Sequence, residues 1–201
     1  MKKIGIFGGT FDPPHLGHLN IAKEAYEVLG LDEVLFMPNG VPAYKLMQHE
    51  ISGKDIRCNM VSAMIEGLSW CRLSTFEIER EGNTYTADTL KLLTDENPDE
   101  EYYIIVGSDS FVYMDKWYEP DVVFSLAKVV VYLRKPDTVS KMNSYYDIYK
   151  RKFNADVFFL KGEYFDISST DIRNMIRNKE NDIPLMYERV LQYIVRNKIY
   201  E

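Results

Sequence analysis

The chain has 201 residues, of which 46% are hydrophobic and 27% are charged. This length can bury one sizeable core, and the composition excludes a disordered or fibrous protein. The 24 basic and 31 acidic residues give a net charge of −7, which repels a polyanion over most of the surface. We therefore expect one globular domain, spanning residues 1–201, that does not bind nucleic acid.

The cysteines and the apolar runs indicate where such a chain works. Cys58 and Cys71 have no partners at metal-ligand spacing, so we expect free thiols in a reducing compartment. The apolar run at 4–7 is too short for a signal peptide. The longest apolar stretch, 122–133, is interrupted by Lys128 and falls short of the roughly 20 residues that a spanning helix needs. These patterns predict a cytoplasmic protein with no membrane partner.

Short runs of β-branched and aromatic residues alternate along the chain with longer segments of helical period. Gly30 follows the first helical segment, where a helix C-cap is expected. In chain order, the pattern predicts a strand over 3–7, a helix over 16–29, a strand over 33–37, a helix over 56–65, a strand over 72–78, a helix over 86–95, strands over 102–106, 128–133 and 157–160, and helices over 170–178 and 184–197, the last with Pro184 at its first position.

This order of elements indicates βαβ units around a parallel sheet. We predict a Rossmann-like, doubly wound α/β fold with a mostly parallel sheet, in which 168–201 forms a small C-terminal helical part of the single domain. The aromatic-rich segment 145–149 indicates an amphipathic helix face. The sequence does not decide whether this face packs inside or forms an interface, so a homo-oligomer stays open.

Small and polar residues follow three of the predicted strands. They are Gly8-Gly9-Thr10, Pro38-Asn39-Gly40 and Gly107-Ser108-Asp109. Ligands of such sheets bind beyond the carboxyl ends of the strands, at the point where the strand order reverses. These three turns therefore predict a site at one edge of the sheet.

The stretch 8–18, GGTFDPPHLGH, has the chemistry of a phosphate site. Its paired glycines let a ligand approach the backbone, and Thr10 adds a hydroxyl. His15 and His18 fall three residues apart in the first turn of the following helix, so both rings share one face near the positive end of the helix dipole. Helix capping is the alternative, and a metal pair ranks last because no third ligand stands at a recognised spacing.

The two commonest nucleotide motifs do not fit this stretch. Residues 5–9 lack the third glycine of a dinucleotide fingerprint, and no Gly-Lys-Ser/Thr of a Walker loop follows.

A second stretch, ISSTDIR at 167–173, places three hydroxyls at a helix start and Arg173 one turn into the helix. Backbone amides, hydroxyls and a guanidinium could bind a phosphate together. Taken alone, however, the stretch favours an N-cap followed by a solvated arginine over a phosphate site.

GGTFDPPHLGH resembles the (H/T)xGH signature of the nucleotidyltransferase superfamily, and ISSTDIR resembles the ISSTxxR signature of its pyridine-nucleotide adenylyltransferases. The whole chain resembles the bacterial nicotinate-nucleotide adenylyltransferases, with further matches at 83–90, 107–109, Phe111 with Trp117, 134–136 and 183–200. Two departures stand out. The family's Pro-Pro-His-Lys segment appears as Val41-Pro42-Ala43-Tyr44-Lys45, and Ser108 replaces a usual alanine, a change small enough to matter little.

The resemblance implies that the phosphate of nicotinate mononucleotide attacks the α-phosphorus of ATP, giving deamido-NAD and pyrophosphate, with Mg2+ arriving on ATP and no metal ligands from the protein. It implies catalytic roles for His15, His18 and Arg173. The ATP-binding residues implied are Gly8, Gly9, Thr10, Phe11, His15, His18, Gly107, Asp109, Ser168, Ser169, Thr170 and Arg173. Those implied for the mononucleotide are Thr10, Lys45, Thr86, Asp109, Trp117, Tyr118 and Arg134.

Some positions keep a plainer interpretation. Tyr85, Met60 and Phe111 are predicted core residues, and His49 is predicted to be solvated. Without the resemblance, Trp117 would also be assigned to the core, although its flat ring could stack on a pyridine.

Other functions also compete with this one. The acceptor could be nicotinamide mononucleotide, or the chain could be a nucleotide sensor without turnover. A phosphopantetheine adenylyltransferase would be shorter and lack the ISSTxxR region. A class I aminoacyl-tRNA synthetase would be longer, less acidic and carry a Lys-rich second signature.

Overall fold

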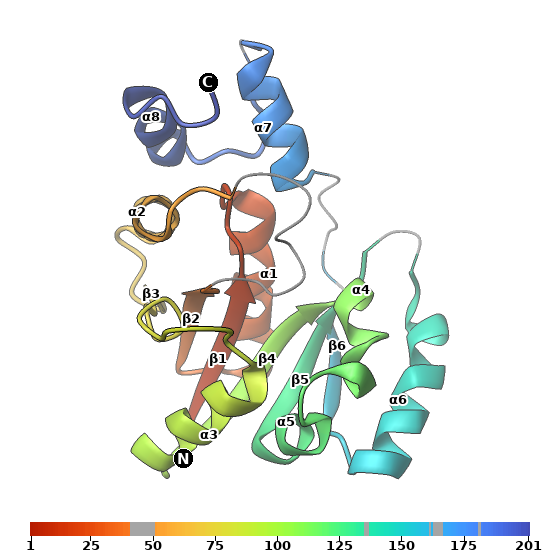
Figure 1. Cartoon of the computed structure of the whole chain (residues 1–201). Coiled ribbons are helices and arrows are strands. Elements are labelled where there is room, and N and C mark those ends of the chain that lie inside the picture. The colour runs from red at the N-terminus through yellow and green to blue at the C-terminus, as the bar shows by residue number, and fades with distance from the viewer. Residues whose placement is uncertain (41–50, 135–136, 161, 163–166, 181) are drawn as a thin grey trace.

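The computed structural model describes residues 1–40, 51–134, 137–160, 162, 167–180 and 182–201. Its centre is a six-stranded sheet in the order β3-β2-β1-β4-β5-β6, with every neighbouring pair parallel. Figure 1 shows helices on both sides of this sheet. The strands are β1 (Lys2–Gly9), β2 (Glu33–Pro38), β3 (Cys71–Leu73), β4 (Glu100–Gly107), β5 (Ala127–Tyr132) and β6 (Val157–Leu160).

The helices between and after the strands fall close to most of the predicted positions. They are α1 (Leu16–Leu29), α2 (Lys54–Ile65), α3 (Thr86–Glu96), α4 (Ser108–Phe111), the 3-10 turn η1 (Met114–Lys116), α5 (Pro120–Leu126), α6 (Val139–Phe153), α7 (Ser169–Arg177) and α8 (Glu188–Arg196). The predicted doubly wound α/β fold is therefore confirmed. Gly30 caps α1 in the left-handed conformation, with φ 58°.

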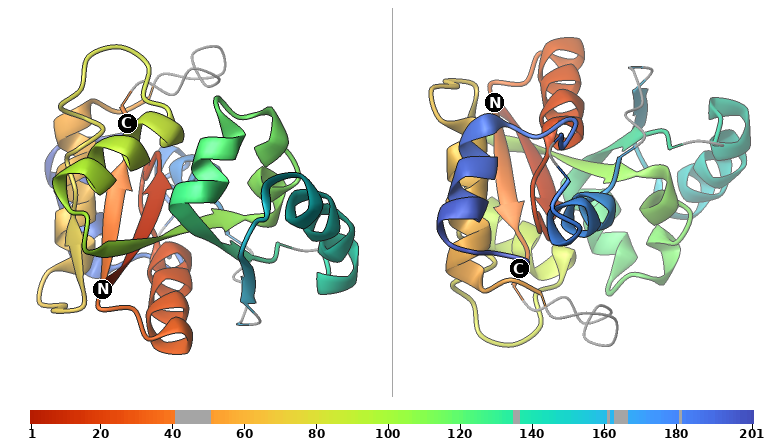
Figure 2. Two further views of the ribbon diagram at one scale, coloured as in Figure 1. Left: turned by 90° about the horizontal axis from the view of Figure 1, so that it is seen from below. Right: turned by 90° about the horizontal axis from the view of Figure 1, so that it is seen from above.

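Alternate side chains of the central strands enter two separate cores. Ile4, Ile6 and Ile104 pack in the core that α3, α5 and α6 cover. Phe7 and Ile105 pack in the core on the other face, which α1, α2 and α8 cover. Figure 2 shows the two helical layers from both ends of the sheet. Because both faces are buried, the strands are nearly continuous apolar runs, as parallel strands usually are.

The strand order reverses between β1 and β4. From β1 the chain crosses through α1 to β2 on one side, while β4 pairs with the opposite edge of β1 and continues through α5 to β5. The carboxyl ends of β1 and β4 therefore open the crevice in which such sheets bind ligands. The segment with α7 and α8 lies beyond this edge (Figure 1).

Several sequence expectations were wrong. The strand predicted over 72–78 ends at Leu73, because the chain turns there and the backbone N–H of Glu79 bonds the carbonyl of Thr75 at 3.0 Å. Pro184 does not open the last helix, which begins at Glu188.

Pro184 instead lies in a turn with Leu185, which has φ 59°. The carbonyl of Leu185 accepts a hydrogen bond from the backbone N–H of Leu16 at 2.8 Å, so this turn caps α1 instead of starting a helix.

Two further differences concern helices and burial. The short helix α5 was not predicted, because its apolar residues run directly into those of β5. Met60 and Phe111 are fully buried as expected, but 38% of Tyr85 is exposed, so its assignment to the core was wrong. The helix indicated by 145–149 is the middle of α6, and Tyr149 is buried against Phe124.

Candidate active site

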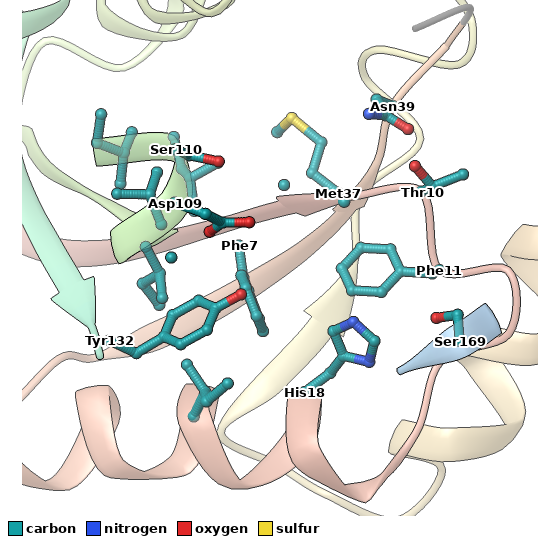
Figure 3. A pocket seen from close by; sticks show the side chains of 18 of the residues that line it. Phe7, Thr10, Phe11, His18, Met37, Asn39, Asp109, Ser110, Tyr132 and Ser169 are labelled. Atoms are coloured by element: carbon teal, nitrogen blue, oxygen red, sulfur yellow. The ribbon is translucent and has the colours of Figure 1, made fainter. Parts of the chain in front are cut away.

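One pocket of about 1030 Å³ opens at the reversal point between β1 and β4. Every predicted site residue that the structure describes lines it: Gly8, Gly9, Thr10, Phe11, His15, His18, Thr86, Gly107, Asp109, Trp117, Tyr118, Arg134, Ser168, Ser169, Thr170 and Arg173. Lys45 and His49 lie outside the described residues, as does the altered segment 41–45. Figure 3 shows part of this lining, with His18, Phe11 and Thr10 facing Asp109 and Tyr132 across the pocket.

The two glycines at the end of β1 shape the floor of the pocket. A Cβ on Gly9 would come within 3.0 Å of the Phe11 ring, while one on Gly8 would meet nothing within 4 Å. Gly9 therefore gives Phe11 room to pack against Phe7, at 5.8 Å between ring centroids. Phe11 has φ 52°, which holds the chain in a sharp turn at this point.

The two histidines lie together, but not both within the helix. His15 is the N-cap of α1, and His18 stands in the first turn, with the ring centroids 3.8 Å apart. The backbone N–H of His15 donates to Nδ1 of His18 at 3.1 Å. A neutral His18 therefore carries its proton on Nε2, where it is a donor. The ring of Phe11 meets His18 edge-on at 5.2 Å.

Burial determines the charge of His15. Only 7% of this residue is exposed, and burial together with the positive charge of Arg134 lowers the pKa of His15 to about 4. The ring is therefore neutral at pH 7. Its Nδ1 is buried and has no hydrogen-bond partner among the described residues. Such an atom is costly in the free protein, which suits a group whose partner is a ligand.

The two predicted motifs touch directly. The hydroxyl of Ser169 donates to the carbonyl of Pro13 at 2.8 Å. The guanidinium of Arg173 donates to the carbonyl of Asp12 at 2.6 Å and to the hydroxyl of Thr170 at 3.0 Å. Arg173 is only 6% exposed, which excludes the solvated charge that the sequence left open. The start of α7 is therefore built onto the loop that precedes α1.

The hydroxyls of this motif are already engaged. Ser168 is indeed the N-cap of α7: its hydroxyl accepts from the backbone N–H of Asp171 at 3.2 Å and donates to the carboxylate of Asp171 at 2.5 Å. The hydrogen bonds that the hydroxyl and the backbone N–H of Ser168 donate to this carboxylate lower the pKa of Asp171. A phosphate at α7 would therefore meet mainly backbone N–H groups and Arg173, whose buried Nε has no partner among the described residues.

The opposite wall carries aromatic and charged groups. Trp117 is half-buried against the core and lines the pocket, and Tyr85 stacks on Tyr118 with ring centroids 4.6 Å apart. Asp109 is exposed, and its carboxylate lies 3.6 Å from the guanidinium of Arg134. These residues come from the segments that follow β4 and β5 in the chain and from the start of α3.

The hydroxyl of Ser108, which an alanine at this position would lack, makes two hydrogen bonds next to the pocket. This buried hydroxyl donates to the carboxylate of Asp137 at 2.7 Å and accepts from the backbone N–H of Arg134 at 3.0 Å. It therefore ties the segment of Arg134 to the end of β4.

Among the lining residues that the sequence analysis did not assign to either substrate, three carry polar groups at the ends of strands or in the turn after β3. Asn39 lies behind β2 with its Oδ1 buried and without a partner among the described residues. The signal was present, since 38–40 had been placed at the site edge. Glu77 accepts hydrogen bonds from the hydroxyls of Thr89 and Thr84 at 2.9 and 3.3 Å, and burial raises its pKa. It was hidden in the mispredicted strand. Tyr132 at the end of β5 is the third.

No group of His, Cys, Asp and Glu residues that could hold a metal occurs within the described ranges, and none of the helices described there is long and apolar enough to cross a membrane. Cys58 and Cys71 are both free thiols.

Comparison with known proteins agrees with this arrangement. Residues 6–175 match the cytidylyltransferase-like family. The chain is 38% identical to a Clostridium novyi protein and 40% identical to one from Bacillus cytotoxicus, in each case over all of both chains, and both carry the name probable nicotinate-nucleotide adenylyltransferase. Two structures of the Plasmodium falciparum nicotinic acid mononucleotide adenylyltransferase, complexed with NaAD and with APC, superpose with TM-scores of 0.82 and 0.80.

Those two structures share 22% and 21% identity with the chain, and each alignment covers 100% of this chain and 98% of the other, so they establish the fold alone. The full-length identity to the bacterial relatives shows the family as well as the fold. The chain therefore belongs to the nicotinate-nucleotide adenylyltransferases, within the cytidylyltransferase-like family.

Proposed function

We propose that this pocket transfers the adenylyl group of ATP to nicotinate mononucleotide, giving deamido-NAD and pyrophosphate in the synthesis of NAD. The observation that carries the proposal is the contact between the two motifs. Because Arg173 and Ser169 bond Asp12 and Pro13, the start of α7 and the histidine pair face one volume. Donors for a triphosphate thus converge from both sides of the pocket.

The reaction needs no side-chain nucleophile. A phosphate oxygen of the mononucleotide forms a bond to the α-phosphorus of ATP, and the bond from this phosphorus to the oxygen bridging to the β-phosphorus breaks. Pyrophosphate leaves with that electron pair, so no covalent enzyme intermediate forms. The protein has to align two polyanions and to stabilise charge that grows on the leaving group.

The roles follow from chemistry and position. His15 and His18 donate to phosphate oxygens near the α-phosphorus, Arg173 and the backbone of α7 hold the outer phosphates, and Thr10 lies near the point of transfer. Gly8 lets a ligand approach the backbone, since nothing lies within 4 Å of its missing Cβ. Mg2+ enters on ATP and neutralises part of the phosphate charge.

The mononucleotide occupies the other wall. The pyridine ring stacks on Trp117, the first turn of α3 at Thr86 and the backbone at Tyr118 face its carboxylate, and Asp109 bonds a ribose hydroxyl. Backbone donors suit a carboxylate better than an amide, which favours the nicotinate form over nicotinamide. We place the enzyme in the cytoplasm.

The test is pyrophosphate release from ATP with each mononucleotide in turn, with and without Mg2+. We expect release with nicotinate mononucleotide and Mg2+, and much slower release with the amide. Faster turnover of the amide would overturn the acceptor assignment. ATP binding without release of pyrophosphate from ATP in the presence of either mononucleotide would mean a nucleotide sensor.

A further inference from the structure

We propose that Tyr200, close to the end of the chain, is a positioning residue for the ATP side of the pocket and acts through Asp12 on Arg173. Its hydroxyl donates to Oδ1 of Asp12 at 2.6 Å, across 188 positions of sequence. The inference rests on the proposed function only in that Arg173 is taken to meet the phosphates of ATP.

Asp12 joins the parts of the site. It is 2% exposed, and its carbonyl accepts the short hydrogen bond from Arg173. Its other carboxylate oxygen accepts from the backbone N–H of Ser52 at 3.3 Å. A buried carboxylate must be satisfied by donors, so the hydroxyl of Tyr200 helps to fix the orientation of Asp12. The carbonyl that holds Arg173 belongs to the same residue, so its direction is fixed as well.

The buried guanidinium of Arg57 fixes the backbone segments around Asp12. Arg57 is 2% exposed and donates to the carbonyls of Thr10, Asn39 and Ser52 at 3.0, 2.9 and 3.1 Å. It also donates to the carbonyl of Gly40 at 3.3 Å. These bonds join the turn behind β1 to the turn behind β2 and to the entrance of α2. Burial lowers the pKa of Arg57, and the negative charge of Asp12 offsets part of this effect.

Tyr200 is held firmly enough to fix another residue. Its φ of 73° is energetically unfavourable for any residue other than glycine, and such a conformation persists only where surrounding contacts impose it. Burial and the charge of Asp12 raise the pKa of its phenol well above the ordinary value, so the hydroxyl stays protonated and remains a donor. Its oxygen also lies 3.8 Å from the sulfur of Met60 in α2.

The surroundings supply a matched control. Tyr193 lies in α8, and its hydroxyl accepts from the side-chain amide of Asn59 at 3.0 Å. It does not line the pocket. Tyr200→Phe and Tyr193→Phe therefore delete the same hydroxyl from the same C-terminal segment, and only the first deletion removes a bond to Asp12.

The experiment measures KM for each substrate, kcat, and the rise in Tm that a non-hydrolysable ATP analogue causes. For Tyr200→Phe we expect KM for ATP to rise about tenfold, which corresponds to about 1.4 kcal/mol, with KM for nicotinate mononucleotide changed less than twofold. The Tm rise given by the analogue should shrink. Tyr193→Phe should match the wild type in all of these.

A purely structural role would lower Tm and leave the KM values and the analogue's effect unchanged, which would overturn the inference. An equal rise in both KM values would do the same. If Tyr200→Phe does not fold, Asp12→Ala is measured in its place, because it removes the acceptor of the Tyr200 hydroxyl and keeps the carbonyl that holds Arg173; the same split is expected. Wild-type enzyme without pyrophosphate release would refute the proposed function, and the analogue's effect on Tm would still decide the role of Tyr200.

Discussion

Replacing His15 with asparagine should make the fold less sensitive to acid. Burial and Arg134 lower the pKa of His15 to about 4, against an ordinary value of 6.5. At pH values between these two pKa values, His15 is mostly protonated in the unfolded chain and mostly neutral in the folded chain. The contribution of His15 is therefore fully present above pH 6.5 and is lost as the pH falls toward 4. Asparagine does not titrate and is a favourable N-cap.

The shift sets the size of the effect. With these two pKa values, lowering the pH from 7.5 to 5 costs the wild type about 2 kcal/mol of unfolding free energy through this one group. The assay is urea unfolding of wild type and His15→Asn at both pH values. Other titrating groups contribute to both proteins and cancel in the difference between the two pH effects. If both proteins lose the same stability between pH 7.5 and pH 5, the ring of His15 is not desolvated as the structure indicates.

Three other substitutions separate roles within the pocket. His18→Ala should lower kcat at saturating ATP by about 10²–10³-fold, because its donor faces charge that develops during the reaction; an unchanged kcat would remove it from the chemistry. Trp117→Ala should raise KM for the mononucleotide about tenfold and leave KM for ATP unchanged. Steady-state kinetics with each substrate varied in turn measures both KM values, and an equal rise in the two would contradict a stacking role for Trp117. Gly107→Ala places a methyl group against the carboxylate of Asp109 and 3.1 Å from the ring of Tyr132, so kcat/KM should fall and unfolding should cost about 1–3 kcal/mol less. Wild-type values for both would show that the turn yields easily.

The parts of the fold that local sequence determines were predictable. The strands β1, β2, β4 and β5 contain apolar runs because both faces of the sheet are covered, and the runs of β1, β2 and β4 end at glycine or proline, which the sequence alone reveals. The site followed from the same logic, since 8–10, 38–40 and 107–109 all lie at the edge that was expected. The histidine pair was also placed correctly on one face, although His15 caps the helix rather than entering it.

What could not be predicted depends on residues that meet only in three dimensions. The chain leaves the sheet after Leu73 and turns at 75–79, where Glu77 accepts hydrogen bonds from Thr84 and Thr89, and a period of two cannot show this. Tyr85 has the composition of a core residue, but its ring lies at the pocket wall against Tyr118. The bond from Tyr200 to Asp12 joins opposite ends of the chain, and no local pattern indicates it.

An acidic protein that binds two polyanions has to supply positive potential locally. This chain carries a net charge of −7, and its pocket includes carboxylates at Asp109 and Asp171. Arg134 lies beside the first, and the second is bound by Ser168 at the start of α7. Among the described residues, the donors on the phosphate side include the neutral ring of His15, the ring of His18, backbone N–H groups and Arg173, which is held on the carbonyl of Asp12.

These donors act by direction as much as by charge. A neutral His15 and a helix N-terminus gain strength only where their hydrogens point at the phosphate, because partial charges fall off quickly with distance and orientation. A fixed conformation of the loop between β1 and α1 therefore contributes to the binding free energy of ATP, because it orients these donors. Arg57 and Tyr200 fix this loop from outside the pocket lining: Arg57 holds the carbonyl of Thr10, and Tyr200 holds the carboxylate of Asp12, whose carbonyl accepts from Arg173.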